Sequence, residues 1–215
     1  MNSDKMQFHI EETKKHKNKV ENYLGLISKI LERRGRVHDD SKLENVENEI
    51  FAVYSSKLKD CTYGSDEYKL YLEEMKPALS HHYKNNRHHP EHFKDGIREM
   101  NLIDIMEMLM DWLAASKRHD NGNIMKSIEL NMSRFGYGEE ISSILKNTIK
   151  YMNGYGMEAV EDLFKEDDNE NVKTIVHEWM TGKSIDIDKY EKKYNKEDVK
   201  NALDIVLSLC SMGLG

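Results

Sequence analysis

The sequence predicts an all-α fold, a helical bundle with a C-terminal helical extension. Three observations support this prediction. Only two prolines, Pro77 and Pro90, and a modest 12 glycines interrupt 215 residues, so little prevents long helices from forming. Apolar residues recur at helical spacing in most segments. Charged residues make up 33% of the chain and hydrophobic residues 38%, a balance that suits helices with long solvated faces.

The first predicted helix covers about residues 11–34, where apolar side chains form one stripe that should be buried. These positions are Val20, Tyr23, Leu24, Ile27, Ile30 and Leu31. The segment RVHDDSKL follows, in which Asp39, Asp40 and Ser41 are all suitable helix N-caps. We therefore expect His38 and Asp39 to lie at a junction between helices.

Further helices follow at similar spacing of apolar residues and turn signals. Their predicted bounds are 44–59, 66–86, 102–117, 123–134, 139–152 and 196–211. The stretch NGYG is the best candidate boundary, because charge-dense segments follow it. We expect a domain at 1–150 and a helical appendage at 151–215.

Composition limits the function classes. Cys61 and Cys210 lie far apart and neither belongs to a CxxC motif, which argues against a thiolate zinc site and favours a reducing compartment. No segment resembles a signal peptide or a membrane span. The net charge of -7 disfavours a broad nucleic-acid-binding surface. A cytoplasmic location is expected.

Histidines are the main candidates for chemistry. Seven of the ten enter one argument: His16, His38, His81, His82, His88, His89 and His92. Imidazole and carboxylate ligands suit Mn, Fe, Co, Ni or Zn, so we expect one or two divalent transition-metal ions per chain. Histidines seven positions apart share a helix face, and Pro90 should leave the later ones on a turn. The alternative is a solvated polar loop whose histidines cap helices or contact backbone.

The predicted helix at 102–117 supplies an independent clue. It is apolar nearly all round, yet Asp104, Glu107 and Asp111 recur on one face, and Arg118 follows near that face. Buried carboxylates are costly unless they are paired or bind a cation. Asp111 is therefore a candidate ligand, and Asp104 or Glu107 could orient ligand histidines. Salt bridges to neighbouring lysines are the alternative.

The ordered set of a histidine on a first helix, a His-Asp pair, a second histidine group and a late aspartate resembles the HD superfamily of metal-dependent phosphohydrolases. HDDSK is similar to the HDxxK of many members, and HHYKNNRHHPEH falls where binuclear members, including the HD-GYP phosphodiesterases, carry additional ligands. The resemblance implies an HD-domain-like bundle. It also implies two ligand sets: His16, His38, Asp39 and Asp111 for one ion, and His81, His82 and His88 for a second. The spacing after Asp39 differs from that of HD-GYP proteins, the GYP residues are missing, and His9 is an alternative to His16.

Longer segments resemble an uncharacterised family of small bacterial and phage proteins. They are RVHDDSKLE, TYGSDEY, ALSHHYKNNRHHPEHF, MNLIDIMEMLMDWLAASKRH and KSIELNMSRF, within residues 12–150. This resemblance implies a family and a bacterial, in some cases phage-encoded, origin, but no activity.

The HD resemblance implies hydrolysis of a nucleotide or cyclic nucleotide phosphate ester by metal-activated water. The expected catalytic residues are His38, Asp39, Lys42 and Arg87. Substrate contacts are expected from Lys42, Tyr83, Asn86, Arg87 and Arg118, although Tyr83 could equally pack in the core. Asp40 is expected to cap a helix rather than to transfer protons.

Two other functions remain open. Some HD-fold proteins use two irons and oxygen, so a di-iron oxygenase is the first alternative. The second is a non-catalytic protein of phage origin that binds a nucleotide or a partner. In either case the segment VKTIVHEWM and the last helix leave room for a homodimer through the C-terminal appendage.

Overall fold

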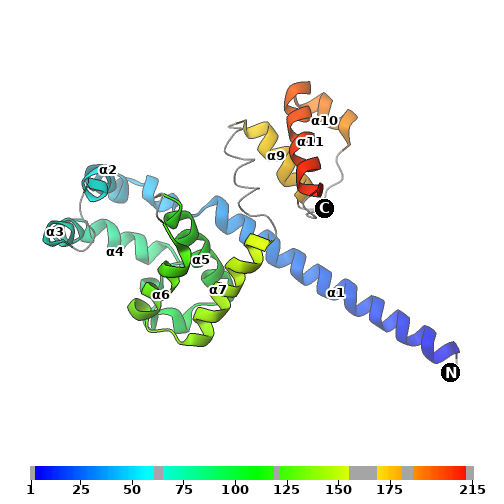
Figure 1. Ribbon diagram of the computed structural model, residues 1–215, viewed down its shortest axis with the longest axis horizontal. Helices are drawn as coiled ribbons and strands as arrows, with labels where there is room; N and C mark the ends of the chain where they lie inside the picture. The colour runs from blue at the N-terminus through cyan, green and yellow to red at the C-terminus, as the bar shows by residue number, and fades with distance from the viewer. Residues whose placement is uncertain (1–2, 61–64, 119–121, 155–168, 181–185, 212–215) are drawn as a thin grey trace. The chain divides into compact units, whose positions relative to one another are not determined.

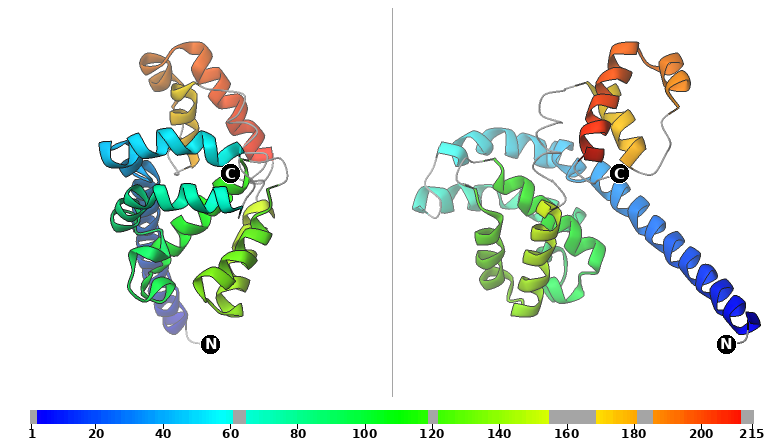
Figure 2. Two further views of the ribbon diagram at one scale, coloured as in Figure 1. Left: turned by 90° about the vertical axis from the view of Figure 1, so that its left-hand side faces the viewer. Right: turned by 45° about the vertical axis from the view of Figure 1, so that its right-hand side comes forward.

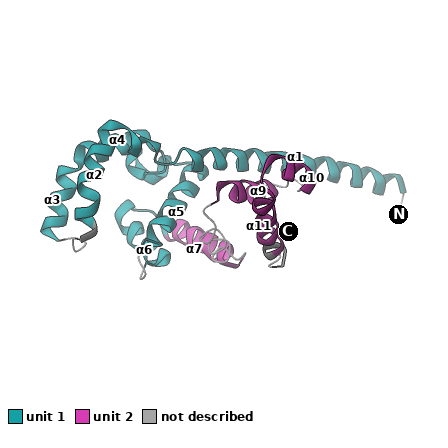
Figure 3. Ribbon diagram, turned by 90° about the horizontal axis from the view of Figure 1, so that it is seen from above, with its two compact units in different colours: residues 1–138 teal, residues 139–215 magenta. Residues whose placement is uncertain are grey.

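The structure is a computed structural model that describes residues 3–60, 65–118, 122–154, 169–180 and 186–211. In these ranges every regular element is a helix and no strand occurs, which confirms the all-α prediction (Figure 1). The chain divides into two compact units, Met1–Gly138 and Glu139–Gly215 (Figure 3). Among the described residues, no helix combines the length and the apolar character needed to cross a bilayer.

The described part of the first unit contains α-helices and short 3-10 helices. Its elements are α1 (Ser3–Arg36), η1 (Asp40–Leu43), α2 (Asn45–Asp60), α3 (Asp66–Glu74), α4 (Lys76–Asn85), η2 (Pro90–His92), η3 (Gly96–Glu99), α5 (Leu102–Ser116) and α6 (Ile124–Phe135). Helix α2 packs against η1 and α4, and α5 packs against α1 and α6. Met108, Leu109 and Leu113 of α5 are buried, as its apolar sequence predicts.

Helix α1 forms where the sequence predicts a helix, but its apolar stripe is not buried as predicted. It is 34 residues long, and none of its residues is buried. Within its own unit it runs away from the other helices towards its N-terminus (Figures 1 and 2). Amphipathic spacing indicates which side of a helix can be covered, but not whether the same chain covers it.

The prediction of a single helix at 66–86 is wrong. The structure has two helices there, α3 and α4, with Met75 between them. Pro77 lies in the first turn of α4. Proline has no backbone N–H to donate to the preceding turn, but it is well accommodated in the first turn of a new helix. The proline therefore separates the two helices.

The second unit contains α7 (Glu139–Gly154), α9 (Glu170–Met180), α10 (Ile187–Lys193) and α11 (Lys196–Ser211). The apolar faces of α9, α10 and α11 form one core, made of Val172, Ile175, Val176, Tyr190, Val199, Ala202, Ile205 and Val206. The sequence places the boundary after residue 150, whereas the compact units divide after Gly138. Gly136 ends α6 in the left-handed conformation just before this division.

Candidate metal centre

Asp39 lies at the junction that the sequence predicts, between the end of α1 at Arg36 and the start of η1 at Asp40. Its backbone is left-handed, with φ 60° and ψ 14°. Among the described residues it is the one non-glycine residue with a positive φ. Such a conformation costs energy and persists where surrounding contacts hold it, which is common at functional sites.

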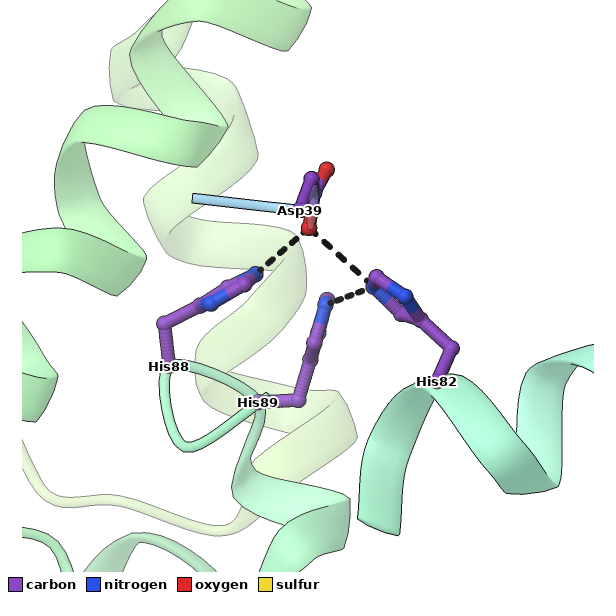
Figure 4. A group of neighbouring side chains, drawn as sticks. All are labelled: Asp39, His82, His88 and His89. Atoms are coloured by element: carbon purple, nitrogen blue, oxygen red, sulfur yellow. Dashed lines mark hydrogen bonds and ion pairs between the residues drawn. The ribbon is translucent and has the colours of Figure 1, made fainter. Parts of the chain in front are cut away.

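Three histidines converge on the Asp39 carboxylate (Figure 4). His82 comes from α4, and His88 and His89 come from the turn between α4 and η2. The Nε2 atoms of His82 and His88 lie 3.3 and 3.4 Å from Asp39 Oδ1. His89 Nε2 lies 2.8 Å from His82 Nε2. We call these four residues the Asp39 cluster.

Two buried carboxylates orient the rings of this cluster. Glu47 Oε2 accepts a hydrogen bond from His82 Nδ1 at 2.8 Å. Glu107 Oε1 lies 3.1 Å from His88 Nδ1. Because an ionised carboxylate can only accept, each Nδ1 must carry the proton, and in the neutral ring Nε2 presents a lone pair. This is the arrangement in which histidine ligands bind metals in proteins.

Two atoms in the cluster are buried without a hydrogen bond, Asp39 Oδ1 and His88 Nε2. A buried acceptor that lacks a partner costs free energy, and the two face one another at 3.4 Å. A cation coordinated by both atoms removes that cost. Imidazole nitrogen and carboxylate oxygen together suit Mn, Fe, Co, Ni or Zn, so the residues fit a divalent transition metal.

A second group of ligand atoms adjoins the first through the other oxygen of Asp39. His38 Nε2 lies 3.5 Å from Asp39 Oδ2 and 3.6 Å from Asp111 Oδ1. His38 Nδ1 donates to Glu107 Oε1 at 2.9 Å. Lys42 Nζ also lies 2.5 Å from Asp39 Oδ2, so a second ion on that oxygen would displace the ammonium. The separations of 3.5 and 3.6 Å in this group are longer than those of 2.8, 3.3 and 3.4 Å in the Asp39 cluster.

The pKa shifts of His38, Asp39 and Glu107 favour positive charge on His38 and negative charge on the two carboxylates. Contacts with Asp111 and Glu107 raise the pKa of His38 to about 10, against the opposing effect of burial. Burial would raise the pKa of Asp39, but contacts with His82 and Lys42 outweigh it and hold that pKa below its usual range. For Glu107, burial is likewise outweighed, by His38 and His88, and its pKa falls to about 2. The carboxylates thus stay ionised near neutral pH.

A family model matches residues 5–166, more than half of the chain. The chain belongs to DUF5662, a family of unknown function. The match spans every residue of the Asp39 cluster and of the second group. A search of curated proteins and a search of solved structures each returned no match.

In this DUF5662 protein the structure brings together most of the predicted ligands. His38, Asp39, His82, His88 and Asp111 all lie in the centre. His16 does not join them, because it is exposed on α1, 18 residues before Arg34. That separation is about 27 Å along a helix axis, and Arg34 contacts Glu107.

The prediction for His81 also needs correction. Its Nδ1 lies 2.7 Å from Glu47 Oε1, so the ring contacts the orienting carboxylate rather than Asp39. Adjacent residues of a helix point about 100° apart, and His82 is the one of the pair that faces Asp39. Glu47 therefore contacts the rings of both His81 and His82.

Among the predicted phosphate contacts, Lys42 lies beside the centre. Its Nζ is 2.5 Å from Asp39 Oδ2, and its side chain is partly exposed. Arg87 contacts other residues instead. Its Nη2 lies 2.9 Å from Asp104 Oδ2, and its guanidinium lies over the Phe93 ring. Arg118 is exposed beyond the C-terminal end of α5.

The two predicted substrate-orienting residues have structural contacts. The Asn86 amide is buried and donates to Ser41 Oγ at 2.7 Å and to the His82 carbonyl at 2.8 Å. It therefore ties η1 to the end of α4. Burial raises the pKa of Tyr83, whose ring centroid lies 5.1 Å from that of His89. The core-packing interpretation of Tyr83 fits this position.

Glu47 and His89 are the residues that sequence reasoning missed. Glu47 is 0% exposed, and it shares a helix face with Tyr54 and Leu58. A carboxylate on the apolar side of a predicted helix is the signal that could have identified it. His89 belongs to the histidine run, but it is not among the ligands that the sequence predicts.

His89 supports a prediction for the metal-free protein. Burial, followed by electrostatic interaction with His88 and His82, lowers its pKa from 6.5 to about 3. Below pH 6.5, His89 is therefore protonated in the unfolded chain but stays neutral in the folded chain. The free energy of unfolding should fall with decreasing pH by about 1.4 kcal/mol per pH unit from this group, down to about pH 3.

Urea unfolding in chelator at a series of pH values measures this slope. The His89→Asn variant lacks the titrating group, so its free energy of unfolding should fall less steeply below pH 6.5 than that of the wild type. Above pH 6.5 the two slopes should agree. Equal slopes below pH 6.5 would show that His89 is not held neutral in the folded chain.

Proposed function

We propose that this protein is a metal-dependent phosphohydrolase that acts on a nucleotide or cyclic nucleotide phosphate ester. The observation that carries the proposal is the pair of buried acceptors without hydrogen bonds, Asp39 Oδ1 and His88 Nε2, inside a centre of histidines and ionised carboxylates. A divalent ion held there would lower the pKa of a water molecule and offset the charge of a phosphate.

The chain's own residues contribute binding and orientation. Glu47 and Glu107 keep the Nε2 atoms of His82, His88 and His38 directed inwards. Lys42 supplies a partly exposed ammonium next to Asp39, where it could contact a phosphate oxygen. Arg87 retains N–H groups beyond those that bind Asp104, so it could contribute as well, although it is the weaker candidate.

Elemental analysis of protein purified without added metal is the first test. We expect one or two transition-metal ions per chain, and we expect chelator treatment to lower the unfolding temperature because only the folded chain assembles the centre. The metal-loaded protein should then release phosphate or nucleoside from some member of a nucleotide and cyclic nucleotide panel. Failure to bind any transition metal under all reconstitution conditions would falsify the proposal.

A di-iron oxygenase is the second candidate, and one observation favours it. The two oxygens of Asp39 face two different groups of ligand atoms, an arrangement that could bridge two ions. About two irons per chain with a mixed-valence signal, and no hydrolysis of the phosphate panel, would select this candidate. Zinc or manganese alone would exclude it.

A further inference from the structure

Helix α1 exposes a large apolar surface. All described residues from Ser3 to Ile30 are exposed, and partial burial begins only at Leu31. Seven large apolar side chains on one side of the helix are between 37% and 67% exposed: Met6, Ile10, Val20, Tyr23, Leu24, Ile27 and Ile30. Isolated helices are marginally stable in water, and most helical stability comes from packing of an amphipathic face.

The exposed apolar side of α1 is continuous with the part of α1 that contacts α5. Arg34 follows Ile27 at i+7, so it lies on the same side of the helix. It pairs with Asp104 of α5 at 3.0 Å and with Glu107. The other described helices of the first unit leave this side free over the preceding 28 residues, about 42 Å of helix.

Charge complementarity fits a second copy of the chain as the partner of this side. Helix α1 carries nine Lys and Arg residues against five Asp and Glu, a net charge of +4. The rest of the first unit, residues 37–138, carries 13 basic and 18 acidic residues, a net charge of -5. A second copy of the chain therefore offers an acidic helical body that complements α1.

The available area is sufficient for a specific dimer. Burying a half-exposed apolar side chain removes roughly 50 Å² of apolar surface, so seven of them remove roughly 350 Å². In an interface of ordinary composition, a little over half apolar, this corresponds to about 600 Å² per partner. That value is the lower limit for stable, specific interfaces.

We propose that α1 packs onto a second copy of this chain, so that the apolar side between Met6 and Ile30 is buried in a homodimer. The sequence pointed instead to the C-terminal appendage as the dimer surface. In the structure, the apolar residues of α9 and α11 pack on each other, including Val176, Val199 and Val206, so they are already used within one unit. The proposal does not depend on the metal centre.

Light scattering coupled to size-exclusion chromatography tests the proposal on the full chain. The wild type should elute at twice the chain mass. The double variant Leu24→Glu/Ile27→Glu, which keeps good helix formers, should shift to the monomer mass. Asn18→Glu/Asn22→Glu places the same added charge on the opposite side of α1 and should remain dimeric.

Hydrogen exchange of the wild type gives a second measurement that does not depend on a variant folding. Amides of residues 6–30 should exchange more slowly at high protein concentration and faster on dilution, because dilution dissociates the dimer. A monomeric wild type with concentration-independent exchange overturns the proposal. So does a monomer that binds anionic vesicles through α1, or one in which residues 139–215 of the same chain protect the helix.

Discussion

The Asp39→Asn variant is expected to lose metal affinity by about 100-fold or more, together with any hydrolytic activity. The substitution removes the negative charge from the oxygen that faces His82 and His88 and from the oxygen that faces His38. Asparagine tolerates the left-handed backbone at least as well as aspartate, so the junction between α1 and η1 should be retained. Competition titration against a chromogenic chelator measures the affinity.

Asp40→Asn is the matched control for this experiment. Asp40 is the next residue, it is exposed, and the substitution makes the same change in charge. Its metal affinity should equal that of the wild type. If Asp39→Asn binds metal as tightly as Asp40→Asn, the Asp39 carboxylate is not a ligand and the proposed centre is wrong.

The Glu47→Gln variant is expected to lower both the stability and the metal affinity. Glu47 is fully buried, and its two oxygens accept from His81 and from His82. Glutamine keeps the shape but replaces one acceptor with an N–H₂ group, so a buried donor then faces a donor. We expect a loss of about 1–3 kcal/mol in the free energy of unfolding and about 10- to 100-fold in metal affinity.

Glu49→Gln, on the same helix but exposed, should change neither quantity. The two measurements separate two roles of Glu47. A residue that only supports the fold would lower the free energy of unfolding in chelator but leave the metal affinity of the folded chain unchanged. A residue that positions His82 lowers both. Unchanged affinity in Glu47→Gln would therefore exclude the positioning role.

Much of the fold and part of the centre could be predicted from the sequence, because both depend on local periodicity. The spacing of Asp104, Glu107 and Asp111 places them on one face of a helix, and the structure confirms that face. Glu107 holds His38 and His88, which agrees with the prediction that a carboxylate of α5 orients ligand histidines. Asp104 is buried and forms salt bridges, as the alternative predicts, but its partners are Arg34 and Arg87 rather than neighbouring lysines.

The rest depended on contacts between segments that are distant in sequence. His82 and His89 meet as their seven-residue spacing suggests, yet α4 ends at Asn85 and a turn brings them together. Whether His81 or His82 faces Asp39 depends on how α2 packs on α4, because Glu47 of α2 lies between the two rings. The exposed position of His16 depends on which helices cover α1. Periodicity alone determines none of these.

The left-handed backbone of Asp39 restricts which amino acids can occupy that position. Glycine and asparagine accept this conformation but lack the negative charge. Glutamate carries the charge but has a longer side chain and no comparable tolerance of a positive φ. Aspartate is the one amino acid that meets both demands, so even the replacement usually regarded as conservative, aspartate by glutamate, is a severe change at this position.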